Sequence, residues 1–108
     1  MSVGLFRRKK KTDSMSLEAL RSLDGRELKY VIRREQDENG SPRETVLGKG
    51  GRFMVLPDRV IVMAGGKEVF NAPLDTVKSG ELMSLDGVVI SGEDGVTGRF
   101  AMVVGYYI

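Results

Sequence analysis

Turn signals recur at short, regular intervals along most of this sequence, and they constrain its fold more than any other feature. From Glu27 onward, dipeptides such as Asn39-Gly40 and Gly65-Gly66 separate runs in which apolar and polar residues alternate. Such dipeptides accept the positive φ angles of tight hairpin turns, and alternation with a period of two is typical of half-buried strands. The chain from Glu27 therefore predicts a series of antiparallel hairpins.

The apolar runs between these turns predict about seven strands. In the first, Leu28, Tyr30 and Ile32 alternate with charged residues. The glycine-rich segment 48–51 predicts a bend or bulge that separates the second strand from the third. We expect a mainly β fold, an antiparallel meander that closes as a barrel or as a two-layer sandwich. The predicted strands cover residues 28–32, 45–47, 53–56, 60–64, 68–71, 88–90 and 97–107.

One short helix is predicted before the strands, over residues 16–23. Leu17, Leu20 and Leu23 fall on one side of a helical wheel, Ser14 or Ser16 can cap its start, and Gly25 can end it. A chain of 108 residues has enough apolar surface for one core. We therefore expect a basic tail over residues 1–13 and a single β-rich domain over residues 14–108.

Two predicted strands contain segments that are apolar on both faces, residues 60–63 in one and residues 100–104 and 106–108 in the other. A sheet with one face in water does not need this pattern. Either the N-terminal helix covers the second face or another chain does, and the second alternative implies a homo-oligomer.

The sequence contains no cysteine and no histidine. Thiol and imidazole nucleophiles, catalytic triads, disulfides and the usual zinc, haem and iron–sulfur ligand sets are therefore excluded. Carboxylate pairs remain, but Asp37-Glu38 and Glu93-Asp94 are predicted in exposed turns, where nothing separates their protonation states. We expect no enzymatic activity, no cofactor and no metal site.

The basic residues are concentrated in the tail. Five of the 17 Lys and Arg residues are consecutive, whereas the rest of the chain is slightly acidic. Each basic residue near an anionic bilayer contributes about 1 kcal/mol, and neighbouring apolar side chains can enter the headgroup layer. The alternatives are a solvated tail without a partner and, less consistent with the acidic body, nucleic acid. The candidate membrane contacts are Leu5, Phe6, Arg7, Arg8, Lys9, Lys10 and Lys11.

The residues after this basic run indicate where the protein is located. Thr12, Asp13 and Ser14 stand where a signal peptide would have its apolar region, and no apolar run approaches the roughly 18 residues of a membrane span. We expect a cytoplasmic protein that is peripheral at the inner face of the membrane when its tail binds there.

The middle of the chain combines three features: a strand–turn–strand pattern over residues 51–63, a strand with a proline–leucine step over residues 68–77, and a short apolar segment over residues 86–90. In these features, over about residues 51–100, it resembles bacterial pleckstrin-homology-like and GRAM-like domains. The resemblance implies an open barrel capped by an amphipathic C-terminal helix. This chain keeps a strand pattern to Ile108, so the helix at 16–23 is expected to provide the cap.

The same resemblance implies a binding or scaffolding module without chemistry of its own. In phosphoinositide-binding members, a basic first hairpin holds the lipid phosphates. Here Lys29, Arg33, Arg34 and Arg43 flank the corresponding bend, but acidic residues occupy its tip. We therefore predict a non-catalytic binding or scaffolding module, recruited weakly to anionic membranes by its tail. The alternative is a self-associating structural module with no membrane role.

Overall fold

The structure, a computed structural model, describes residues 15–36 and 38–108, and these form one short α-helix and one antiparallel sheet. The mainly β class and the antiparallel pairing predicted from the sequence are confirmed. The elements are α1 (Leu17–Arg21), β1 (Glu27–Gln36), β2 (Pro42–Val55), β3 (Arg59–Ala64), β4 (Lys67–Pro73), the 3-10 turn η3 (Leu74–Thr76), β5 (Lys78–Glu81), β6 (Gly87–Asp94) and β7 (Arg99–Tyr107).

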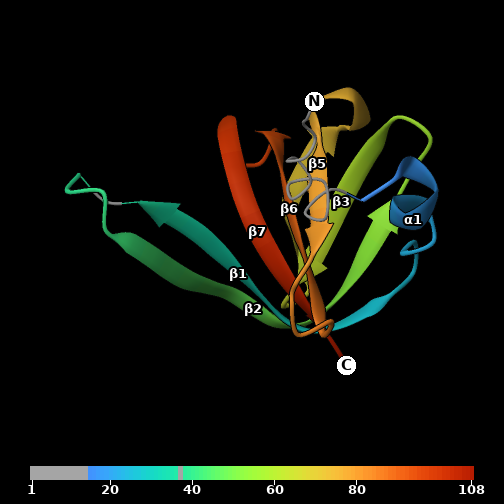
Figure 1. Ribbon diagram of the computed structural model, residues 1–108, viewed down its shortest axis with the longest axis horizontal. Helices are drawn as coiled ribbons and strands as arrows, with labels where there is room; N and C mark the ends of the chain where they lie inside the picture. The colour runs from blue at the N-terminus through green and yellow to red at the C-terminus, as the bar shows by residue number, and fades with distance from the viewer. Residues whose placement is uncertain (1–14, 37) are drawn as a thin grey trace, which may run out of the picture.

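The seven strands belong to a single sheet with the order β4-β3-β2-β1-β7-β6-β5. The sheet curls into a half-barrel (Figure 1), so that its two halves face each other rather than forming separate layers. Its concave side holds the core, in which Phe53, Phe70 and Leu28 are the largest fully buried side chains. Of the two predicted architectures, a barrel and a two-layer sandwich, the structure corresponds to a barrel that is incomplete.

The helix α1 caps one end of this half-barrel. Ser16 is its N-cap, and the Ser16 hydroxyl accepts a hydrogen bond from the Ala19 amide at 3.1 Å. Leu20 and Leu23 are buried in the core, whereas Leu17 is exposed. The segment around the helix connects the two sides of the curled sheet. Before the helix, the Met15 amide donates a hydrogen bond of 2.8 Å to the Ser79 carbonyl of β5. After it, the Asp24 carboxylate accepts a hydrogen bond of 2.9 Å from the Val55 amide of β2.

The helix covers the concave face and not the second face of β3. Val60 and Val62 belong to the same buried cluster as the helix leucines. Side chains alternate along a strand, so Ile61 and Met63 lie on the convex face, where both are half-buried. The expectation that the helix would cover the second face of residues 60–63 is therefore wrong.

The glycine-rich segment 48–51 does not end a strand. It lies within β2, which runs through both the second and the third predicted strands. The bulge expected there is found beside it, since Val31 pairs with Gly48 but Ile32 pairs with Val46, which leaves Leu47 as the extra residue. A Cβ atom at Gly51 would overlap the Met63 carbonyl oxygen, so glycine at this position allows β2 to approach β3 closely.

The strand β5 was not predicted from the sequence. Its residues Lys-Ser-Gly-Glu carry no apolar side chain, and only Gly80 among them is buried. The strand exists because it pairs with the apolar β6, from Lys78 opposite Ser91 to Glu81 opposite Val88. The pattern of its partner, and not its own, places it in the sheet.

Candidate functional site

The strands β1 and β7 are paired along only part of their length. Their register runs from Leu28 opposite Tyr107 to Arg33 opposite Val103. Beyond this point, residues 34–36 pair only with β2, and residues 99–102 pair only with β6, among the described strands. Figure 1 shows the far part of the β1–β2 hairpin diverging from β7. We call the space between residues 34–36 and residues 99–102 the fork.

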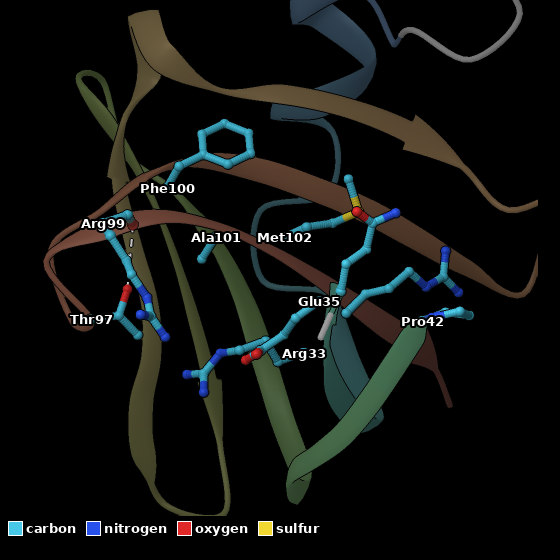
Figure 2. Close-up of a pocket in the computed structure, with 10 residues that line it drawn as sticks. Arg33, Glu35, Pro42, Thr97, Arg99, Phe100, Ala101 and Met102 are labelled. Atoms are coloured by element: carbon cyan, nitrogen blue, oxygen red, sulfur yellow. Dashed lines mark hydrogen bonds between the residues drawn. The ribbon is translucent and has the colours of Figure 1, made fainter. Parts of the chain in front are cut away.

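The fork contains a groove with a volume of about 640 Å³. One wall comes from β1 and the start of β2, and the other from the β6–β7 turn and the start of β7 (Figure 2). Both walls present strand edges whose alternate backbone N–H and C=O groups have no neighbouring strand. The groove is lined by residues 33–36, Pro42, Thr97 and residues 99–102.

Two arginines in the groove have no counterion among the described residues. Within residues 15–36 and 38–108, neither Arg33 nor Arg99 forms an ion pair or a side-chain hydrogen bond. The Nε atom of Arg33 is buried and has no hydrogen-bond partner among the described residues. In Figure 2, Arg99 extends from its wall towards the wall that carries Arg33 and Glu35. A buried donor without a partner costs free energy, so the guanidinium of Arg33 favours the binding of an anionic ligand.

The other charges of the groove do not cancel these two arginines. Arg34 is paired with Glu44 across β1 and β2, with 3.1 Å between Nε and Oε2. Glu35 contributes one carboxylate, on the same face as Arg33 because the two are two positions apart in one strand. The groove therefore keeps a net positive charge.

Asp94 lies opposite Arg99 in the sheet, but its carboxylate forms hydrogen bonds with other residues. Its side chain is 2% exposed, and one oxygen accepts hydrogen bonds from the amides of Asn71 and Val96, at 2.9 and 3.0 Å. The other oxygen accepts from the Thr97 amide and hydroxyl, at 3.1 and 2.9 Å. The prediction of an exposed turn at Glu93-Asp94 is wrong for Asp94, which ties β4 to the β6–β7 turn.

Some of the residues predicted from the sequence to take part in binding lie outside the described part of the chain. The membrane contacts Leu5, Phe6, Arg7, Arg8, Lys9, Lys10 and Lys11 precede the described residues, as does the predicted tail 1–13. Of the basic residues that flank the first hairpin, Arg33 and Arg34 line the groove. Arg99 and Phe100 were not predicted as site residues, because they reach the groove through the long-range pairing of β7 with β1.

Two other features are absent from the described residues. No group of three or more acidic side chains comes together there in a way that could hold a metal ion. The described part of the chain also has no helix with the length and apolar character needed to cross a bilayer.

Comparison with known proteins finds no match to this chain among protein-family models, curated proteins or solved structures.

Proposed function

We propose that this chain is a non-catalytic binding module whose ligand site is the groove of the fork, and that the groove takes an anionic group. The observation that carries the proposal is the pair Arg33 and Arg99, which face one groove without a counterion among the described residues. Guanidinium groups bind carboxylate and phosphate oxygens through paired N–H donors, and they stay charged at all physiological pH values.

The groove is suited to binding rather than to chemistry. Its titratable groups are three arginines and Glu35, and it holds no pair of acids whose protonation states differ. The chain also lacks cysteine and histidine. Binding without turnover is the function that these side chains support best.

The resemblance to pleckstrin-homology-like domains is part of this proposal. A curled antiparallel sheet, open on one side and capped by a helix that buries Leu20 and Leu23, supports it. Members of that class serve as binding modules, which agrees with a site made of arginines and strand edges. The proposed location is the cytoplasm.

An NMR titration with inorganic pyrophosphate tests the groove. We expect amide shifts at residues 33–36 and 99–102, and an affinity at least tenfold lower for the double variant R33Q/R99Q. The matched control is R52Q, which removes an arginine whose partner Glu27 lies outside the groove. Shifts that are absent at millimolar pyrophosphate, or equal affinity in all three proteins, would contradict the proposal.

The basic tail adds a second, independent element. Five consecutive basic residues beside Leu5 and Phe6 support weak recruitment of the module to anionic membranes. Co-sedimentation with vesicles containing phosphatidylserine should exceed that with neutral vesicles, and deletion of residues 1–11 should abolish the difference. Equal recovery on the two kinds of vesicle would refute a membrane role for the tail.

Self-association is the alternative function, and the convex face of the sheet favours it. Tyr30 and Tyr106 stack there with their ring centroids 4.6 Å apart, and Ile61 and Met63 are half-buried on the same face of β3. Sedimentation equilibrium distinguishes the two functions. A concentration-dependent dimer would support a structural module, and a monomer at the highest concentrations would reject it.

A further inference from the structure

We infer that the occupant of the fork is an extended, acidic segment of a partner polypeptide, which adds as a strand to the free edge of β7. The inference rests on the proposed function, since it identifies the ligand of the same groove. It is carried by three observations: an unpaired strand edge, a space of suitable length beside it, and a distribution of charged and apolar side chains that selects a particular peptide pattern.

The first observation is that the fork exposes strand edges, while each of the two outer edges of the sheet is hydrogen-bonded at one residue. At β4, the Gly95 amide donates to the Asn71 carbonyl over 2.7 Å, next to the bond from the Asn71 amide to Asp94. At β5, the Ser79 carbonyl accepts from the Met15 amide. An unpaired edge is a template for another strand. Residues 99–102 of β7 have no strand partner on the β1 side among the described residues, although the Arg99 carbonyl accepts a hydrogen bond from the Thr97 hydroxyl at 3.3 Å.

The second observation is the size of the space. Four residues of free edge correspond to about 13 Å of extended chain, at about 3.3 Å per residue. A strand added to β7 would lie about 4.8 Å from it, on the side from which β1 has diverged. The groove volume of about 640 Å³ gives this segment room between the two walls.

The third observation is the distribution of side chains on the two faces of the fork. Arg33 and Arg99 lie on the concave face, since they share it with the buried Val31 and Ala101. Phe100 lies on the convex face and is 57% exposed. Successive side chains of an added strand point to opposite faces, so acidic residues would meet the arginines and apolar residues would meet Phe100.

These observations favour a polypeptide over a small anion or a lipid headgroup. A phosphate would satisfy the guanidinium groups, but it would leave the edge of β7 and the exposed Phe100 ring without partners. A peptide with alternating acidic and apolar residues satisfies all three. The predicted ligand is therefore a short acidic segment with a period of two.

The test uses the full chain and the heptapeptide Glu-Val-Glu-Val-Glu-Val-Glu, titrated by NMR alongside inorganic pyrophosphate. Two further peptides carry N-methyl groups on the amides of alternate residues, one set in each peptide. A strand uses one set of amides for one neighbour, so methylation of at least one set should weaken binding by tenfold or more. The variant R33Q/R99Q should weaken binding of the unmethylated peptide by at least tenfold, and R52Q should not.

The outcomes separate this inference from the proposed function. If pyrophosphate binds and the peptide does not, or if both methylated peptides bind as well as the parent, the strand is refuted while the anion site stands. If neither ligand binds, both the anion site and the added strand are refuted. If the protein is a dimer that the peptide dissociates, the occupant is a second copy, and the inferred partner is wrong.

Discussion

The curled sheet leaves two places where strands face each other without pairing, and it treats them differently. At the first, which we call the seam, β4 meets β6, and the buried carboxylate of Asp94 joins Asn71 to the β6–β7 turn. At the second, the fork, β1 and β7 diverge around Arg33 and Arg99, and no side chain of the described residues bridges them.

The difference shows how unpaired backbone can be used. At the seam, an anionic side chain accepts hydrogen bonds from the backbone donors, so the gap is closed from within and contributes to stability. At the fork, the cationic side chains are themselves donors and cannot satisfy one another. The seam has its acceptor within the chain, whereas we propose that an anionic ligand supplies the acceptor at the fork.

The largest effect is expected from breaking the seam. Asp94→Ala leaves the amides of Asn71, Val96 and Thr97 without their acceptor, and should lower the free energy of unfolding by about 3 kcal/mol or more. Urea denaturation followed by circular dichroism measures the loss. Glu93→Ala is the control, because the Glu93 side chain is exposed, and it should change stability by less than about 0.5 kcal/mol. Equal effects would mean that the seam is not held by Asp94.

The next effect tests the tightly packed part of the sheet between β2 and β3. Gly51→Ala places a methyl group against the Met63 carbonyl, and the strands must separate to accept it. We expect a loss of about 2 kcal/mol in urea denaturation. Gly95→Ala, whose added Cβ would find no atom closer than 3.5 Å, is the matched control, and a similar loss there would show that the close approach is not the cause.

A smaller effect is expected at high pH, at the paired end of β1 and β7. Burial raises the pKa of Tyr106 and of Tyr107 above the usual 10.0. The unfolded chain therefore loses these protons first as the pH rises, and the stability present below pH 10 falls as the pH passes through the raised values. The urea midpoint should be lower at pH 11 than at pH 9, and Tyr107→Phe should reduce the difference. A midpoint that does not change with pH would contradict this.

The smallest effect on stability is expected at the fork itself. Arg33→Met removes a buried donor that has no partner among the described residues, so the free energy of unfolding should stay within about 0.5 kcal/mol of the parent or rise. A loss above about 1.5 kcal/mol would show that Arg33 supports the fold and would weaken the contrast with Asp94. Ligand binding by the same variant provides the complementary measurement.

Much of the fold could be predicted from local patterns in the sequence. The Gly65-Gly66 turn joins β3 to β4 as predicted, with both residues at positive φ, and Ser16 caps the helix. The strand β5 and the continuity of β2 were missed for a shared reason. Both depend on what lies across the sheet, namely β6 for the polar residues 78–81 and Met63 for Gly51.

Only one wall of the candidate site could be predicted from the sequence. Arg33 and Arg34 were recognised as basic residues that flank the first hairpin, but Arg99 carries no signal in its own segment. It reaches the groove because β7 pairs with β1, and the register of that pair ends at Arg33 opposite Val103. A single sequence contains no local pattern for where two distant strands cease to pair.

The pairing of β1 with β7 also has a consequence for synthesis of the chain. The β1–β2 hairpin can form as soon as it leaves the ribosome, whereas β7 follows the other six strands in chain order. The β7-facing edge of β1 therefore stays unpaired until β2 to β6 have been synthesised. Residues 28–33 are then covered when β7 arrives. Residues 34–36, in the fork, are the part of this β1 edge that stays unpaired in the folded protein.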